Sequence, residues 1–270
     1  MVEQEFVKIS ERHALFVRDW GSGPPIVLLA GWAMPSDLWG PVMVMLSDCG
    51  FRTVAYDRRG HGRSSDPGTV DYDDLADDLA AVLEARDLRG CTVVAHSGAA
   101  GEVIRYVTRH GAARLHRIVL VGAQGPCLLQ SDDNPDGIPR EAFETLLLQL
   151  KEDLPGWIDD NIDAFVPGAS QGTRTWVSEM ILGCSRRIAI DLQRAIAEAD
   201  LRLEAQRLDL PVTVIHGDLD ASCPIDMTGR RYAKLIAGAS FIIYEGAAHG
   251  LMLTHPRRLA DDIVAQCSRV

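Results

Sequence analysis

The stretch VVAHSGAAGEV, residues 93–103, decides how the chain is interpreted. It runs from β-branched apolar residues through Ser97 to a cluster of small residues and an amphipathic segment. This order predicts a buried strand, a sharp turn and a helix, with Ser97 at the turn, as in a nucleophile elbow. The usual G-x-S-x-G pattern is absent, because Ala95 and Ala99 stand where both glycines are expected. Ser97 could equally be the N-cap of the helix, so the stretch alone leaves both interpretations open.

The size of the side chains around Ser97 bears on this choice. In a nucleophile elbow, the residues two before and two after the serine face neighbouring backbone and must be small. Glycine fits best and alanine next, and residues 98–101 (GAAG) keep the whole first helical turn small. The start of the helix also offers backbone N–H groups to a developing oxyanion.

The rest of the chain alternates between strand and helix patterns, and the first two strands read as a β-hairpin. Eight segments have the composition of strands: 5–9, 13–18, 26–31, 51–57, 91–96, 117–123, 212–218 and 240–247. Helical periodicity occurs at 36–48, 71–87, 98–110 and 256–267. Strands that alternate with helices predict an α/β protein with a mostly parallel, doubly wound, eight-stranded sheet flanked by helices.

Residues 124–207 do not follow this alternation. They contain no good strand, but they show helical patterns at 139–151, 155–165, 173–183 and 186–198. We therefore expect a helical cap at 124–207, inserted into a core domain formed by 1–123 and 208–270.

Composition excludes several classes of protein. A net charge of −11 over 270 residues argues against nucleic-acid binding. There is no run of about 18 apolar residues for a membrane span and no apolar segment at the N-terminus for a signal peptide. The six cysteines are scattered, which favours reduced thiols over a zinc site or a disulfide framework. No cofactor motif is visible, so we expect a cytoplasmic enzyme without metal or cofactor.

Two further polar residues follow predicted strands. Asp220 lies in HGDLDASCP after the penultimate strand, and His249 lies in EGAAHGLML after the last one. The chain order Ser…Asp…His is the order of an α/β-hydrolase triad. His249 would take the proton of Ser97, and Asp220 would orient the imidazole and stabilise its charged form. Asp220 could instead initiate a turn, with Asp218 as a rival acid, and His249 could be a loop histidine.

Beyond these residues, nearly the whole chain resembles a known family. The stretches that carry the resemblance are 55–67 (AYDRRGHGRSSDP), 76–88, 101–111, 131–139, 216–225 and 246–256 (GAAHGLMLTHP). They are similar to the α/β-hydrolase superfamily, in its branch of bacterial non-haem haloperoxidases (perhydrolases) and esterases. The resemblance implies that Ser97 is the nucleophile, Asp220 the acid and His249 the base.

The resemblance also implies where the oxyanion is bound. The family's loop usually reads H-G-aromatic-P, and here residues 30–33 read A-G-W-A. The backbone N–H groups of Trp32 and Gly98 are therefore the expected oxyanion donors. Ala30 replaces a bracing histidine, Ala33 a proline associated with peracid formation, and Gly98 a common methionine. These departures argue for perhydrolysis as a side activity at most.

Other residues fall into a pocket group and a structural group. Trp32, His96, Trp157, Phe165 and Trp176 are candidates for the substrate pocket, although His96 is expected mainly to pack beneath the elbow. The run RRGHG at 58–62 is interpreted as a turn that shapes the loop after a strand.

The leading hypothesis is a serine hydrolase that cleaves a small ester or lactone through a Ser97 acyl-enzyme. One alternative is a cofactor-free dioxygenase of the same fold that opens N-heteroaromatic rings. In those enzymes the acid follows the sixth strand, where this chain reads VGAQG (121–125) without a carboxylate. Another alternative is a small-molecule receptor with slow turnover. The expected partner is a small molecule, and the sequence leaves a homo-oligomer open.

Overall fold

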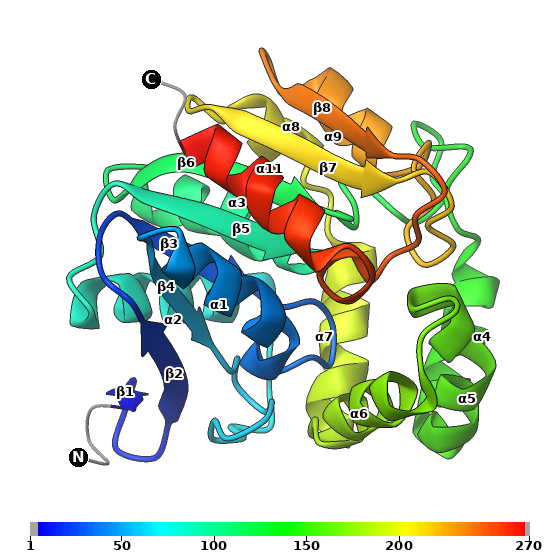
Figure 1. The fold of residues 1–270 in the computed structure, drawn as a ribbon. Helices are drawn as coiled ribbons and strands as arrows, with labels where there is room; N and C mark the ends of the chain where they lie inside the picture. Colours follow the sequence, from blue (N-terminus) through cyan, green and yellow to red (C-terminus); the bar gives the residue numbers. More distant parts are fainter. Residues whose placement is uncertain (1–4, 268–270) are drawn as a thin grey trace.

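The computed structural model describes residues 5–267, and in this range one sheet crosses the molecule (Figure 1). Its strand order is β1-β2-β4-β3-β5-β6-β7-β8. The strands are β1 (Phe6–Lys8), β2 (Ala14–Trp20), β3 (Pro25–Leu29), β4 (Arg52–Tyr56), β5 (Cys91–His96), β6 (Leu115–Val121), β7 (Val212–Gly217) and β8 (Ser240–Tyr244). The prediction of an eight-stranded α/β sheet is therefore confirmed.

Only the N-terminal edge of the sheet is antiparallel. β1 pairs with β2, and β2 pairs with β4, in antiparallel register, whereas the pairs from β4 to β8 are parallel. β5 lies between β3 and β6, and all six of its residues are buried. A strand covered on both faces needs a continuous apolar run, which is what the sequence CTVVAH supplies. The carboxyl end of β5 leads directly to Ser97 at the middle of the sheet.

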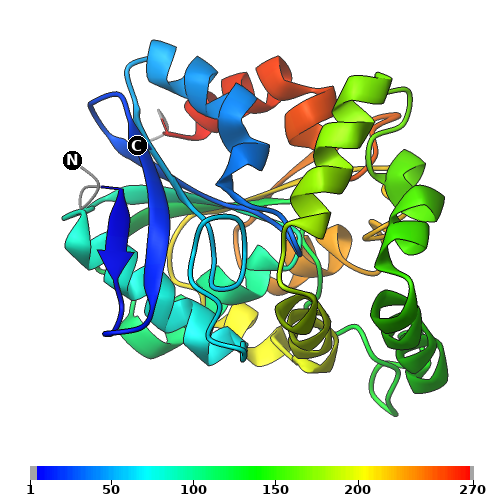
Figure 2. The same ribbon diagram turned by 90° about the horizontal axis from the view of Figure 1, so that it is seen from below.

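Helices cover both faces of the sheet, which Figure 2 shows nearly edge-on. α1 (Gly40–Asp48) packs against α11 (Pro256–Cys267) on one face, preceded by the 3-10 turn η2 (Ser36–Trp39). The other face carries α2 (Tyr72–Ala85), α3 (Ala99–His110), α8 (Arg202–Gln206) and α9 (Gly229–Leu235), and α10 (Leu251–Thr254) precedes α11. Within residues 5–267 no helix has both the length and the apolar character needed to cross a membrane.

Four of the five helices between β6 and β7 stand at one end of the molecule, coloured green to yellow in Figure 1. They are α4 (Arg140–Glu152), α5 (Leu154–Phe165), α6 (Gln171–Leu182) and α7 (Arg186–Glu198), and we call them the inserted helices. α4 packs against α5 and α7, and α5 packs against α6. Each begins and ends within two residues of the helical pattern predicted for it.

The prediction differs from the structure at the ends of several strands and in the short helices; the last strand, for example, ends at Tyr244 and not at residue 247. The sixth strand begins at Leu115 and ends at Val121, not at residues 117–123, because Gly122 takes a positive φ of 51° and turns the chain. The helices α8, α9 and α10 were not predicted, since four to seven residues complete too few turns to show a helical period.

Candidate active site

Ser97 occupies a strained turn between β5 and α3. Its φ of 57° lies in the left-handed region, which non-glycine residues rarely adopt. The turn is held by the Ser97 N–H, which donates to the carbonyl of Val121, and by the Ser97 carbonyl, which accepts from Gln124 N–H at 3.1 Å. Strain that the surroundings maintain in this way is typical of functional sites. The structure therefore has the turn that the sequence predicted at Ser97.

The small residues around the turn are required by close neighbours. Ala95 and Ala99 are fully buried, so larger side chains would have no room. A Cβ on Gly98 would lie 2.5 Å from Ile196 Cδ1, on α7. The inserted helices thus fill the space that a methionine would take at this position. This contact is a physical reason for the glycine in place of the family's methionine.

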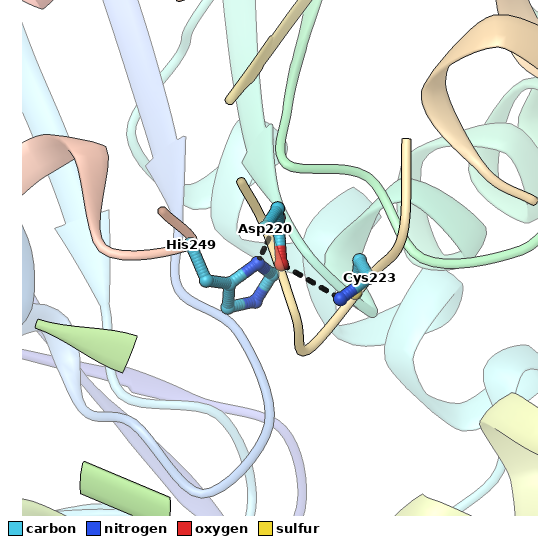
Figure 3. Close-up of side chains that lie close together, drawn as sticks. All are labelled: Asp220, Cys223 and His249. Atoms are coloured by element: carbon cyan, nitrogen blue, oxygen red, sulfur yellow. Dashed lines mark hydrogen bonds and ion pairs between the residues drawn. The ribbon is translucent and has the colours of Figure 1, made fainter. Parts of the chain in front are cut away.

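Ser97, His249 and Asp220 form one chain of hydrogen bonds. The distance from Ser97 Oγ to His249 Nε2 is 3.0 Å. The distance from His249 Nδ1 to Asp220 Oδ2 is 2.6 Å, a contact that Figure 3 shows as a dashed line. Asp220 follows β7 and His249 follows β8, so adjacent strands deliver the two side chains to Ser97. An ionised carboxylate only accepts hydrogen bonds, so the imidazole carries its proton on Nδ1 and can accept the serine proton at Nε2.

Three groups keep Asp220 ionised in a buried place. Burial alone would raise the pKa of this carboxyl, but His249, His216 and the backbone N–H of Cys223 together hold the pKa well below its usual range. Cys223 N–H donates to Asp220 Oδ1 at 2.7 Å, and His216 Nε2 lies 3.3 Å from Asp220 Oδ2. The rival Asp218 is exposed and accepts from Gly246 N–H instead. Of the two acids, only Asp220 bonds to His249.

The Cys223 thiol lies beside this chain of hydrogen bonds (Figure 3). Donor atoms of Asp220, Cys223 and His249 lie within 4.8 Å of one another, a set that a zinc ion could use. Both oxygens of Asp220, however, already accept hydrogen bonds, and a metal ion here would have to break the bond between Asp220 and His249. Burial and the charge of Asp220 raise the pKa of the thiol well above its usual value, so it stays protonated. We therefore attribute the cluster to the hydrogen-bonded triad and not to a metal centre.

Two backbone N–H groups next to Ser97 are without a hydrogen-bond partner in the described part of the chain. Within residues 5–267, neither Trp32 N–H nor Gly98 N–H donates a hydrogen bond to another protein group. The loop that carries Trp32 approaches the elbow closely, since a Cβ on Gly31 would lie 3.0 Å from Ser97 Cβ and 2.7 Å from His96 Nδ1. Unpaired donors held by a rigid backbone can bind negative charge that develops during a reaction. They are the same two donors that the resemblance implied.

A buried charged cluster lies beneath this loop. Arg58 donates through Nη2 to the carbonyl oxygen of Gly31, and its Nη1 lies 3.5 Å from Glu102 Oε2. The Tyr56 hydroxyl donates to Glu102 Oε1. The exposed fraction is 1% for Arg58 and 0% for Glu102. Arg58 was interpreted from the sequence as part of a structural turn, and its contact with the loop at residues 30–33 was missed because no local pattern connects the two segments.

The protonation of Glu102 leads to a prediction about stability. Burial raises the pKa of its carboxyl from 4.5 to about 7, against the opposing effects of Arg58 and the Tyr56 hydroxyl. Because the folded protein holds this proton more tightly than the unfolded chain does, the carboxyl contributes its full stability below pH 4.5, its pKa in the unfolded chain. The contribution is lost as the pH rises to about 7, its pKa in the folded protein. Relative to Glu102→Gln, the wild type should lose about 3 kcal/mol of unfolding free energy between pH 4.5 and 7.

This difference can be measured by urea unfolding of both proteins at about pH 5 and about pH 8. The exposed Glu84 on α2 provides the matched control, because Glu84→Gln should follow the wild type across the same range. A Glu102→Gln variant whose stability changes with pH in parallel with the wild type would contradict a raised pKa at this position.

A cavity of about 350 Å³ opens at Ser97. Of the five pocket residues expected from the sequence, Trp32, His96, Trp157 and Phe165 line it, and the indole of Trp32 donates to the Ala189 carbonyl on α7. Trp176 does not line the cavity but packs against the hydrophobic core. The polar lining residues that the sequence analysis missed are Gln124, Asn161, Gln193, Ser222 and Cys223.

His96 packs against the triad histidine as a neutral ring. Its exposed fraction is 1%, and neither ring nitrogen has a hydrogen-bond partner within residues 5–267. Its ring centroid lies 4.6 Å from that of His249 and 6.2 Å from that of Phe165. Burial and the neighbouring His249 lower the pKa of His96 well below its usual value. Because His96 is uncharged, it adds no charge beside His249 and Asp220.

A serine, histidine and aspartate joined in this order at the carboxyl edge of a doubly wound sheet define the class of α/β-hydrolases. The family model described as "alpha/beta hydrolase fold" matches residues 24–256. The chain belongs to this family.

Comparison with known proteins shows which members of the family the chain is similar to. The chain is 37% identical to the non-heme chloroperoxidase CPO-A1 of Kitasatospora aureofaciens over 246 residues, which cover 88% of this chain and 90% of that protein. It is 32% identical to the bifunctional esterase/perhydrolase DCH of Acinetobacter calcoaceticus over 262 residues, 93% of this chain and 95% of that protein. The structure of a bromoperoxidase from Bacillus anthracis superposes with a TM-score of 0.92 at 29% identity, covering 96% and 98% of the two chains. The resemblance to haloperoxidases and esterases is confirmed.

Proposed function

We propose that this protein is a serine hydrolase that cleaves a small carboxylic ester or lactone through an acyl-enzyme at Ser97. The observation that carries the proposal is the hydrogen-bonded chain from Ser97 through His249 to Asp220, at the wall of a cavity and beside two unpaired backbone N–H groups. Nucleophile, base, orienting acid and oxyanion donors are the four parts that acyl transfer requires.

The geometry supports the following acylation step. His249 Nε2, 3.0 Å from Ser97 Oγ, takes the serine proton as the oxygen attacks the ester carbonyl. The carbonyl oxygen becomes negative and accepts from the N–H groups of Trp32 and Gly98. The imidazolium is stabilised by Asp220, which the surroundings keep ionised. His249 then protonates the leaving alcohol, and the bond between the carbonyl carbon and that oxygen breaks.

Deacylation repeats these steps with water. His249 takes a proton from the water, whose oxygen attacks the acyl carbon of the Ser97 ester, and the same two N–H groups accept the developing charge. The proton on His249 then passes to Ser97 Oγ as the acid product leaves. With a lactone the alcohol and the acid belong to one molecule, so ring opening releases a single hydroxy acid.

The cavity supports a substrate of modest size and largely apolar character. Its volume of about 350 Å³ lies at the lower end of ordinary small-molecule sites. Side chains such as Leu146, Trp157 and Ile158 come from α4 and α5, so we propose that residues 124–207 act as the cap that shapes the pocket. The related DCH protein is described as an esterase and perhydrolase, which supports acyl chemistry at this site.

The two alternatives have less support. The residue after β6 that lines the cavity is Gln124, not an acid, whereas Asp220 after β7 bonds to His249. This arrangement is the hydrolase one and not that expected of the dioxygenases. A receptor would need no unpaired oxyanion donors beside a strained serine, yet the site has both.

A fluorophosphonate probe tests the proposal directly. We expect one covalent adduct, located at Ser97 by peptide mapping, together with turnover of short aryl esters or lactones. Folded protein without an adduct would overturn the proposal. Saturable ester binding with no turnover would favour the receptor, and oxygen uptake with a hydroxyquinolone would favour the dioxygenase.

A further inference from the structure

We propose that Arg58 is a positioning residue for the oxyanion site, holding the Gly31–Trp32 peptide so that its N–H faces the reacting carbonyl. The inference rests on the proposed function, because it concerns how that site binds its transition state. The contact that carries it is the hydrogen bond from Arg58 Nη2 to the carbonyl oxygen of Gly31.

One peptide group joins Gly31 to Trp32. The Gly31 carbonyl and the Trp32 N–H belong to the same planar unit, and in a trans peptide they point in opposite directions. A donor that fixes the Gly31 oxygen therefore fixes the direction of the Trp32 N–H on the other side of the plane. That N–H has no protein partner within residues 5–267.

Apart from the backbone N–H of Met34, which donates to the same Gly31 carbonyl oxygen at 3.3 Å, the loop has few means of holding this peptide. Ala30 and Ala33 have no side-chain donors, and Ala33 has a strained φ of 55°. The indole of Trp32 is engaged with Ala189 on α7. Gly31 must also remain free of a side chain, because a Cβ there would meet His96. A guanidinium beneath the loop supplies a hydrogen bond that the loop's own side chains do not.

Arg58 is itself held in place by α3. Its Nη1 lies 3.5 Å from Glu102, and Glu102 accepts from the Tyr56 hydroxyl on β4. Glu102 belongs to the same helix that begins just after Ser97. The cluster thus connects the loop with Trp32 to the helix behind Gly98, so the two oxyanion donors are braced relative to each other.

The second donor peptide is braced through its carbonyl in the same way. The Gly98 N–H shares a peptide with the Ser97 carbonyl, which accepts from the backbone N–H groups of Gln124 and Ala100, each at 3.1 Å. The two braces differ in charge. A cationic donor forms a stronger hydrogen bond than a neutral one, and it polarises the peptide so that the opposite N–H becomes a better donor. Arg58 therefore affects both the direction and the strength of the Trp32 donor.

The test compares Arg58→Met, which keeps much of the buried volume, with Arg58→Lys, which keeps a cationic donor. We expect Arg58→Met to lower kcat roughly 100-fold, as for the loss of one oxyanion donor, with little change in KM. The affinity for a trifluoromethyl ketone or boronic acid, both mimics of the tetrahedral intermediate, should fall by a similar factor. Arg58→Lys should recover part of both losses.

Arg59 offers a matched control on the neighbouring residue. It is also buried, but it pairs with Asp78 and Asp74 on α2 and not with the loop. Arg59→Met should lower thermal stability without a parallel loss of affinity for the intermediate mimic. If Arg58→Met does not fold, Arg58→Lys and Tyr56→Phe are compared with the wild type instead. In both variants, kcat and the affinity for the intermediate mimic should fall in parallel.

The proposal would be overturned by folded variants at Arg58 whose kcat and mimic affinity match the wild type, or whose losses appear only in KM. Failure of the proposed function has a different signature, since wild-type protein would then form no fluorophosphonate adduct at Ser97. An adduct in the wild type together with unchanged kcat in Arg58→Met would reject the role of Arg58 alone.

Discussion

Replacing Ser97 with alanine should lower kcat/KM for an ester substrate by roughly 10⁵- to 10⁶-fold, the size found when a serine nucleophile is removed from a triad. Ser97 is the only member of the proposed triad that would form a covalent bond to the acyl group, so the acyl-enzyme route is closed without it. The remaining rate would come from the oxyanion donors and substrate binding. Steady-state kinetics with a chromogenic ester, combined with intact mass after fluorophosphonate treatment, measure both effects.

The fold of the Ser97→Ala variant should be preserved. The variant removes one buried hydroxyl and relieves nothing in the backbone turn, so its melting temperature should stay close to that of the wild type. Ser185 provides a control, because it precedes α7, lies outside the cavity lining and makes no capping hydrogen bond. Ser185→Ala should retain both activity and labelling. Ser97→Ala protein that kept more than about 1% of the activity would refute the nucleophile.

Replacing Asp220 with asparagine should lower kcat roughly 10⁴-fold while leaving KM nearly unchanged. The carboxylate accepts from His249 Nδ1 at 2.6 Å, which places the imidazole proton away from Ser97. An amide can turn its NH₂ group toward Nδ1 and stabilise the opposite tautomer, whose Nε2 cannot accept the serine proton. The loss of negative charge also leaves the imidazolium without a counter-ion.

Asp218 allows a matched comparison two residues away. It is exposed and accepts from Gly246 N–H, so Asp218→Asn should change the rate by less than a factor of a few. The fluorophosphonate reaction of Asp220→Asn should slow in parallel with its kcat, because both need the activated serine. If Asp220→Asn and Asp218→Asn lost kcat to the same extent, Asp220 would not be the acid that acts through His249.

The architecture could be predicted closely from the sequence because the signals for strands and helices are local. Buried parallel strands require continuous apolar runs such as CTVVAH at 91–96, and amphipathic helices require a period that 186–198 displays over its whole length. Helices of four to seven residues, such as α10, complete too few turns to show a helical period and were missed. The end of the sixth strand was placed two residues late because Gly122, which turns the chain, resembles any strand-terminal glycine until its φ is known.

The structure brings together the candidate site residues that follow strand ends, and it adds cavity-lining residues that the sequence did not indicate. Ser97, Asp220 and His249 could be proposed from the sequence because a doubly wound sheet carries its site at the carboxyl ends of its strands. Trp176 was placed in the pocket from composition alone; it is partly buried and packs against the core, next to the inward face of α6 formed by Val177, Met180 and Ile181. Gln124, Asn161 and Gln193 have no sequence signature, and only the packing of the inserted helices brings them to the cavity.

The sequence by itself therefore determined the sheet, the elbow at residues 93–103 and the order of the three triad residues, since these depend on patterns within a few residues. The tertiary structure alone decided how the elbow is completed. It shows that residue 98 must be a glycine because the Ile196 side chain of α7 occupies the space of a Cβ. It also places Arg58 against the Gly31 carbonyl. Such contacts join residues 27 and 98 positions apart, where side-chain reach and backbone direction, not local pattern, decide which atoms meet.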